Sequence, residues 1–159
     1  MQISIVYGTY SNSTGLATEL LESELVKMGH TVARMLISGA TPAALQAAEF
    51  LVIASPSWDY QGQQGMPHED FTKFHETNPN LDLKDKPIAI MGLGDSSFTL
   101  FCGAVDHLTQ WFESYGAQIA VEPLKIDQYY FDEAHAKQQI LAWAKDVDSA
   151  AKRWAEKSA

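Results

Sequence analysis

The amino-acid sequence predicts an α/β protein, a doubly wound five-stranded parallel sheet with helices on both faces. The first observation is a set of runs that are apolar on both faces, as strands covered by helices on both sides must be. The second is that an amphipathic segment follows each run, and strands that alternate with helices favour a parallel sheet. The runs are residues 3–6, 32–37, 50–54, 88–91 and 119–121.

Side-chain spacing and end signals place a helix after each of these runs. Ala17, Leu21, Leu25 and Met28 form the apolar stripe of a first helix, which Gly29 ends. A second helix is expected from Thr41 and Pro42 onward, a third over residues 68–77, and a fourth over residues 104–115, before Gly116. The fifth is expected from Asp132 onward, and its apolar stripe consists of Ile140, Ala144, Val147, Ala151 and Trp154. Residues 1–159 are expected to form a single domain, in which residues 148–159 extend the last helix.

Composition and charge exclude several classes of function. The chain has 11 basic and 20 acidic residues, a net charge of −9, which disfavours nucleic acid and membrane surfaces and favours basic protein partners. The sequence enters a strand at once, without the apolar segment of a signal peptide. The single cysteine, Cys102, excludes an internal disulfide, and the scattered histidines indicate no metal site. We therefore expect a cytoplasmic monomer.

Three chemically unusual loops leave the carboxyl ends of predicted strands, where ligands bind in doubly wound sheets. The first, residues 8–14, brings the hydroxyls of two serines and two threonines and the amide of one asparagine to the start of a helix. Backbone N–H groups and the helix dipole at such a position attract phosphate. The loop has no lysine or arginine, so it is not a Walker A site. The alternative is a polar turn with an ordinary N-cap at Ser13 or Thr14.

The second and third loops each carry an aromatic ring. In residues 55–67, Trp58 is either a core plug or a stacking surface, and Gly62 and Gly65 indicate unusual backbone angles. In residues 92–103, Phe98 offers a second aromatic wall, whereas Phe101 is expected in the core. A hydroxyl-rich cradle and two aromatic walls together describe the site of a mononucleotide with a large flat ring.

The third loop closely resembles the third flavin-binding loop of flavodoxins. The resemblance is strongest in Gly94-Asp95-Ser96-Ser97 and in Phe101-Cys102-Gly103-Ala104-Val105-Asp106, and it extends over roughly residues 1–150. The chain is similar to the short-chain subgroup, since little room for an insertion exists between Gly116 and Asp132. The resemblance implies non-covalently bound FMN and a low-potential one-electron carrier between a reductase and acceptor enzymes.

At several positions this sequence differs from the flavodoxin pattern. Asn12 stands where the family has glycine, Tyr10 adds bulk, and a shifted register ending at Gly15 is a second alignment of the phosphate loop. Asp59 follows Trp58 where many members have glycine, and the loop is longer than in close relatives. The resemblance places these residues at the cofactor: Thr9, Tyr10, Ser11, Asn12, Ser13, Thr14, Ser57, Trp58, Asp59, Tyr60, Gly94, Asp95, Phe98, Phe101 and Cys102.

The resemblance also assigns roles within this set. Trp58 is the inner and Phe98 the outer stacking residue, and the backbone N–H groups of Asp95 and Cys102 bond the flavin edge. Apart from the resemblance, like-charge repulsion from carboxylates at Asp59, Asp95 and Asp127 is expected to lower the potential of the bound flavin. Basic-faced flavin or ferredoxin-type reductases and redox acceptor proteins are the expected partners, bound transiently. Two alternatives are a flavodoxin-like NAD(P)H-dependent flavin reductase and a flavodoxin-like interaction module that has lost FMN. No nucleophile–base arrangement indicates a catalytic residue.

Overall fold

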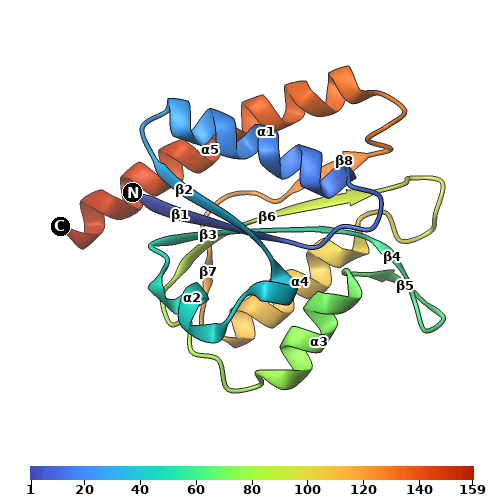
Figure 1. Cartoon of the computed structure of the whole chain (residues 1–159), viewed down its shortest axis with the longest axis horizontal. Coiled ribbons are helices and arrows are strands. Elements are labelled where there is room, and N and C mark those ends of the chain that lie inside the picture. The colour runs from blue at the N-terminus through green and yellow to red at the C-terminus, as the bar shows by residue number, and fades with distance from the viewer.

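Parallel strands lie side by side in one sheet (Figure 1). The structure, a computed structural model, describes residues 1–159. The order is β2-β1-β3-β6-β7, with β8 also paired to β6. The doubly wound fold class is therefore confirmed, and the strand order changes direction between β1 and β3. The strands are β1 (Gln2–Tyr7), β2 (Thr31–Leu36), β3 (Phe50–Pro56), β6 (Pro87–Gly94), β7 (Gln118–Ile119) and β8 (Leu124–Asp127).

The fifth strand differs from the prediction of a strand over residues 119–121. It consists of two short segments, β7 and β8, which both pair with β6. Pro123 has no N–H to donate and lies in the interruption between them. The carbonyl of Glu122 accepts a hydrogen bond from Nε1 of Trp143 at 2.9 Å instead of joining the sheet. The second segment, β8, carries the chain to the end of the sheet where the predicted loops lie.

Helices cover both faces of the sheet (Figure 1). Helices α1 (Ser13–Lys27) and α5 (Glu133–Ser158) pack on one face over a core that includes Leu21, Phe50 and Trp143. Helices α2 (Pro42–Ala47), α3 (Glu69–Thr77) and α4 (Gly103–Ser114), with the short 3₁₀ helix η1 (Ile37–Gly39), lie on the other. The side chains of Thr41 and Asp132 cap α2 and α5 as the sequence predicts, because each accepts a backbone N–H.

A β-hairpin that the sequence does not predict occupies the second loop. It joins β4 (Trp58–Tyr60) to β5 (Gln63–Met66). The turn residues Gln61 and Gly62 have φ values of 52° and 80°, the left-handed pair that suits tight hairpins. Gly65, at φ 71°, approaches α4 so closely that a Cβ on Gly103 would lie 2.8 Å from its carbonyl oxygen. The base of the hairpin is therefore fixed on the start of α4.

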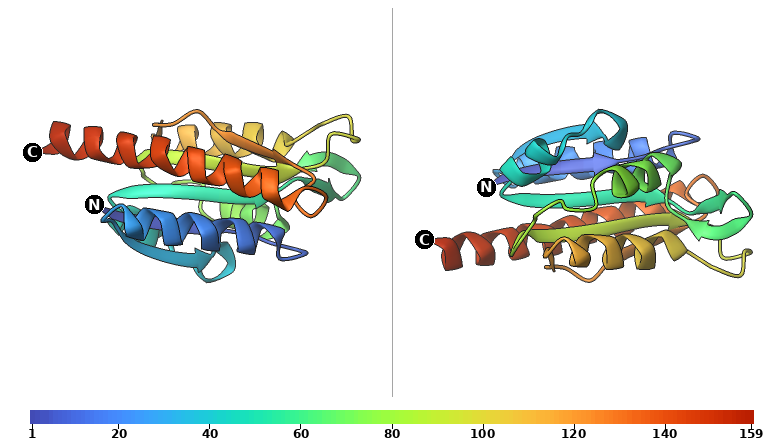
Figure 2. Two further views of the ribbon diagram at one scale, coloured as in Figure 1. Left: turned by 90° about the horizontal axis from the view of Figure 1, so that it is seen from above. Right: turned by 90° about the horizontal axis from the view of Figure 1, so that it is seen from below.

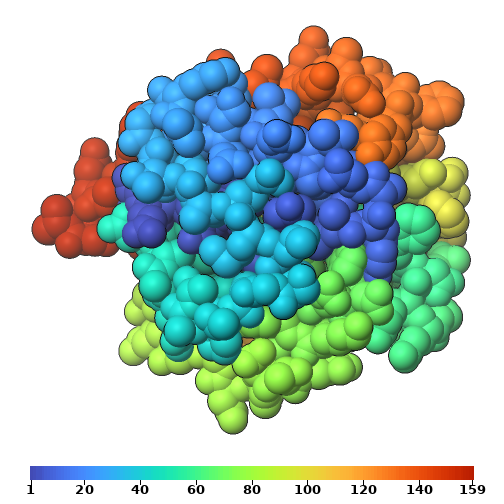
Figure 3. Space-filling view, viewed as in Figure 1, coloured from blue at the N-terminus to red at the C-terminus, as the bar shows by residue number.

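The loops at the carboxyl ends of the strands gather at the end of the molecule opposite the two termini (Figure 2). The space-filling view places the first loop, the hairpin, the loop after β6 and the segment after β8 along the same side of the protein (Figure 3). The last turns of α5 extend beyond the body at the opposite side. None of the helices combines the length and the apolar composition that a membrane crossing would need.

Candidate functional site

A cavity of about 580 Å³ opens among these loops. This volume lies within the range of small-molecule sites. All three predicted loops contribute to it, together with a fourth segment, residues 128–131, after β8. The lining residues are Ser11, Ser13, Pro56, Ser57, Trp58, Asp59, Gln64, Gly65, Leu93, Gly94, Asp95, Phe98, Leu100, Gln128, Tyr129, Tyr130 and Phe131.

The first loop forms an open cradle at the N-terminus of α1. Asn12 is left-handed, with φ 67°, so it adopts the backbone conformation that the family's glycine would supply. Helix α1 begins directly after it at Ser13, which places Gly15 inside the helix and favours the first alignment over the shifted register. The side chain of Asn12 does not cap the helix. A Cβ on Gly15 would lie 2.2 Å from Oδ1 of Asn12, so a larger residue at this position would make the Asn12 side chain move.

Unpaired donors of this cradle suit an anion. The backbone N–H groups of residues 10–15 donate to no backbone carbonyl, as expected for the first turn of a helix. The hydroxyls of Thr9 and Thr14 are buried without a hydrogen-bond partner. Ser11 and Ser13 line the cavity beside them. Buried hydroxyls and a helix N-terminus without a lysine or arginine fit a phosphate held by neutral donors.

Arg34 of β2 lies behind this cradle rather than in it. Its Nη1 donates to the carbonyl of Gly15 at 3.3 Å and to the hydroxyl of Tyr7 at 3.1 Å. Its Nε donates to Oε2 of Glu22 at 2.9 Å. Arg34 therefore ties the first turn of α1 to the sheet while its charge is paired with Glu22.

Trp58 forms one wall of the cavity, at the beginning of the hairpin. Its side chain is 49% exposed, so the interpretation of Trp58 as a core plug is wrong. The ring of Tyr10 meets Trp58 edge-on, with centroids 5.3 Å apart and planes at 77°. Asp59, also on the cavity, accepts the N–H of Gly62 at 2.9 Å and so ties the hairpin turn together.

Phe98 faces the cavity from the loop after β6 and is 61% exposed. Polar bonds hold this loop on the end of β8. The N–H and hydroxyl of Ser96 donate to the two carboxylate oxygens of Asp127 at 2.8 and 2.6 Å. Asp95 accepts from the N–H and hydroxyl of Ser97 and from Nε2 of Gln128. Hydrogen bonds from Ser97 and Gln128 hold the pKa of Asp95 below its ordinary value.

The fourth segment was missed by sequence reasoning. The hydroxyl of Tyr130 donates to the carbonyl of Ser11 at 2.5 Å, which links this segment to the phosphate cradle. Phe131 is 89% exposed at the rim. The available signal was the run Tyr129-Tyr130-Phe131. This run indicates a part of the site only if residues 124–127 are first identified as a strand that ends at the cavity.

The remaining predicted residues do not line the cavity. Cys102 is fully buried and left-handed, with φ 50°, and burial raises the pKa of its thiol to about 12. It lies so close to Gly94 that a Cβ there would be 3.1 Å from its backbone nitrogen. Phe101 packs against the core cluster beside α4, in accord with its expected place. The predicted residues absent from the lining are Thr9, Tyr10, Asn12, Thr14, Tyr60, Phe101 and Cys102.

Comparison with known proteins agrees with this geometry. The sequence model of the flavodoxin family matches residues 5–143. This chain belongs to the flavodoxin family. A flavodoxin from Maridesulfovibrio salexigens is 30% identical over 145 residues, which cover 90% of this chain and 94% of that protein. A flavodoxin from Nitratidesulfovibrio vulgaris is 28% identical and covers 93% of this chain and 97% of its own length.

Solved flavodoxins share the fold. Oxidised flavodoxin 2 from Bacillus cereus superposes with a TM-score of 0.81 at 27% identity, and the match covers 99% of each chain. The flavodoxin of Fusobacterium nucleatum bound to flavin mononucleotide superposes with a TM-score of 0.80 at 18% identity, over 93% of this chain and 97% of that one. The predicted resemblance to short-chain flavodoxins is thus confirmed. No three histidine, cysteine, aspartate or glutamate side chains are grouped so that they could hold a metal ion.

Proposed function

We propose that this flavodoxin binds one FMN non-covalently in the cavity and carries single electrons at low potential between a reductase and acceptor proteins. The observation that carries the proposal is a cavity with an open helix N-terminus in one wall and two exposed aromatic rings, Trp58 and Phe98, in the others. A phosphate and a flat heteroaromatic ring require these two kinds of surface together.

The phosphate would lie on the unpaired N–H groups at the start of α1. Ser11 and Ser13 face the cavity there, and the hydroxyls of Thr9 and Thr14, close to them in the chain, are buried without a partner within the protein. The flat ring would lie between Trp58 and Phe98, which gives both of its faces an aromatic partner. No positive side chain lines the cavity, so dipoles and hydroxyls would hold the phosphate charge.

FMN, when bound, supplies the one-electron redox chemistry. The protein's own groups bias that chemistry through charge. Asp59 and Asp95 line the cavity, and Asp127 accepts hydrogen bonds from Ser96, the residue after Asp95. Each carboxylate disfavours added negative charge on a nearby ring, and this effect lowers the potential of the electron held there. The lowered pKa of Asp95 keeps this carboxylate charged at neutral pH.

An electron carrier fits these residues better than an enzyme. A ring covered by Trp58 on one face and Phe98 on the other is closed to hydride transfer from a nicotinamide. Leu100 and Phe131 stay exposed at the rim, on a chain with a net charge of −9. Such a face suits brief contact with a basic partner surface, and we expect the protein to act as a cytoplasmic monomer.

One pair of measurements separates the three functions. The purified protein is reduced stepwise with dithionite and, separately, mixed with NADH or NADPH under steady-state conditions. The proposal predicts a flavin spectrum that is reduced in two resolved steps, and no nicotinamide oxidation above that of free FMN. Nicotinamide oxidation by the protein alone would indicate a flavin reductase. A colourless protein that stays colourless after incubation with FMN would indicate an interaction module.

A further inference from the structure

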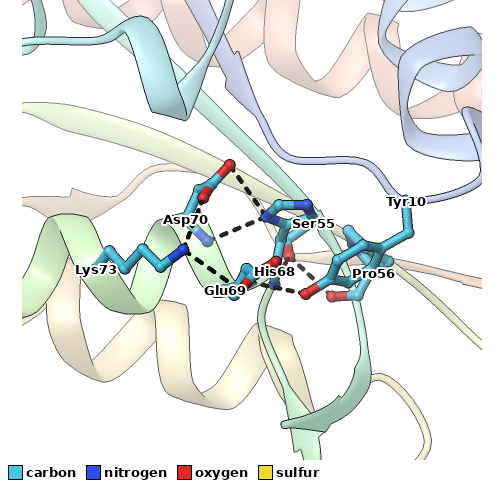
Figure 4. Close-up of polar contacts among 7 residues, drawn as sticks. All are labelled: Tyr10, Ser55, Pro56, His68, Glu69, Asp70 and Lys73. Carbon is cyan, nitrogen blue, oxygen red and sulfur yellow. Dashed lines mark hydrogen bonds and ion pairs between the residues drawn. The ribbon is translucent and has the colours of Figure 1, made fainter.

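Tyr10 and His68 form a stacked pair next to Trp58; Figure 4 shows the two rings of the pair. Their ring centroids are 4.0 Å apart and their planes differ by 25°. Tyr10 also contacts Trp58 in an edge arrangement, with ring centroids 5.3 Å apart and planes at 77°. Tyr10 belongs to the phosphate loop by sequence, yet its side chain turns away from the cavity and supports the other wall.

His68 is fixed on three sides. Its backbone N–H donates to the hydroxyl of Ser55 at 2.8 Å, and its Nδ1 accepts the N–H of Asp70 at 3.1 Å, which caps α3. Its side chain also fills the space beside Gly8, where an added Cβ would lie 2.7 Å from the Cβ of His68. Figure 4 shows the contacts of His68 with Ser55 of β3 and with Asp70 of α3. The imidazole has little freedom to move without moving its neighbours.

Tyr10 is tied to the same helix. Its hydroxyl accepts the N–H of Glu69 at 3.0 Å, the first residue of α3. The beginning of α3 therefore holds both members of the pair, His68 through its ring nitrogen and Tyr10 through its hydroxyl. A change at the imidazole would pass to Tyr10 through the stacked faces and from Tyr10 to Trp58 through the edge contact.

We propose that Tyr10 and His68 are positioning residues for the Trp58 wall, and that protonation of His68 shifts the Trp58 ring. The first half rests on the proposed function, because Trp58 is taken as a flavin wall. The second half concerns the chain alone. Neutral His68 accepts the N–H of Asp70 at Nδ1, so its proton lies on Nε2. A protonated ring carries a proton on both nitrogens and cannot accept that bond.

The surrounding charges define what the protonated ring would do. On α3 it faces the carboxylate of Asp70, whose Oδ2 lies 3.6 Å from Nδ1, and more distantly Glu69 and Lys73. From the first loop it faces the backbone of Thr9 and the phenol of Tyr10, and from β3 the neutral hydroxyl of Ser55. Gaining a proton would therefore turn Nδ1 from the Asp70 N–H toward the Asp70 carboxylate, and the stacked ring of Tyr10 would follow.

Burial lowers the pKa of His68 below the ordinary value of 6.5, although Asp70 and Glu69 oppose this effect. The ring is thus mostly neutral at pH 7 and takes its proton at a pH below 6.5. His75 provides a matched control on the same helix. Burial lowers its pKa too, and it stacks on Trp111 at 4.5 Å, away from the cavity.

The decisive experiment labels the tryptophans of the apoprotein with 5-fluorotryptophan and records ¹⁹F spectra from pH 5 to pH 8. The Trp58 resonance is identified by its loss in Trp58→Phe. We expect it to shift with a single midpoint below 6.5, to lose this shift in His68→Phe and to keep it in His75→Phe. A Trp58 resonance that does not move with pH, or that titrates equally in His68→Phe, would overturn the proton coupling.

A binding measurement tests the positioning role. The FMN dissociation constant of Tyr10→Ala is expected to rise about tenfold, as for loss of an aromatic contact, and that of Tyr10→Phe to stay within about twofold. Equal affinity of Tyr10→Ala and the unmodified protein would overturn the role. If no variant and not even the unmodified protein bound FMN, the proposed function would fail, while the ¹⁹F result would still decide the coupling.

Discussion

The two aromatic walls of the cavity are held by different kinds of force. Trp58 sits on a hairpin whose base is packed against α4, and its ring is backed by Tyr10 and His68. Phe98 sits on a loop that polar bonds from Asp95 and from Ser96 attach to the end of β8. The Trp58 wall is thus supported by packing and the Phe98 wall by hydrogen bonds to carboxylates.

This difference indicates which wall is already in place before a ligand arrives. A packed ring loses little freedom when a ligand stacks on it, because its rotamer is already restricted. An exposed ring on a tethered loop must be ordered at that moment, which costs part of the stacking energy. We therefore expect the Trp58 wall to contribute more to flavin affinity than the Phe98 wall, and the two walls to respond differently to pH.

The largest effect is expected from removing the packed wall. Trp58→Ala should weaken FMN binding by about 2–3 kcal/mol, the upper part of the range for a stacked aromatic ring. Fluorescence titration of the apoprotein with FMN measures this loss. Trp154→Ala, at the far end of α5, is the matched control and should bind as the unmodified protein does. Unchanged affinity in Trp58→Ala would mean that the flavin uses another wall, with Tyr60 of β4 as the next candidate.

Removing the tethered wall should cost less. Phe98→Ala is expected to weaken FMN binding by about 1 kcal/mol, the lower part of the same range, because the free loop must first be ordered. Phe98→Tyr, which keeps the ring, should restore the affinity in the same titration. A loss equal to that of Trp58→Ala would show that packing behind the ring does not decide its contribution.

The tether of the Phe98 loop should not respond to mild acid. The pKa of Asp95 is lowered by the hydrogen bonds from Ser97 and Gln128. A carboxyl with a lowered pKa contributes stability above its ordinary range and loses it only as the pH falls through the folded-state value. Asp95→Asn should therefore weaken FMN binding about twofold to threefold, by the same factor at pH 7.5 and pH 5.5. If the loss of FMN affinity in Asp95→Asn were smaller at pH 5.5 than at pH 7.5, the Asp95 carboxylate would already be partly protonated at pH 5.5.

The smallest expected effect is electrostatic. Asp59→Asn keeps an oxygen to accept the N–H of Gly62 and removes one negative charge from the cavity. The potential of the second electron should become less negative by about 10–20 mV, as expected for one exposed charge near the ring in water. Asp59→Gly would remove both the charge and the hydrogen bond from Gly62 that stabilises the hairpin turn, so it is the less specific variant. Unchanged potentials in Asp59→Asn would show that solvent screens this carboxylate.

Sequence reasoning predicted those parts of the molecule that depend on local pattern. Two-sided apolar runs located β1, β2, β3 and β6, and a strong stripe with a capping Asp132 located α5. The left-handed conformation of Asn12 and the positive φ of Gly62 follow from the intrinsic freedom of these residue types. The predicted phosphate loop, Trp58 and Phe98 meet at one end because parallel strands end there.

The parts that were missed depend on contacts between distant residues. The hairpin strands β4 and β5 are short, and four of their seven residues are exposed, so no hydrophobic alternation marks them. The break before β8 reflects Pro123 and the bond from Trp143 of α5, which lies far along the chain. By its position in the sequence, Tyr10 belongs to the phosphate loop. Its ring stacks instead on His68, at the start of α3, and this contact between distant residues cannot be predicted from the local pattern.

The most direct test of the account is the identity and stoichiometry of the bound flavin. The purified protein is saturated with FMN, freed of excess ligand and denatured, and the released flavin is chromatographed against FMN and FAD standards. The account predicts one FMN per chain for the unmodified protein and less than that for Trp58→Ala handled identically. Release of FAD, or of no flavin after saturation with FMN, would contradict it.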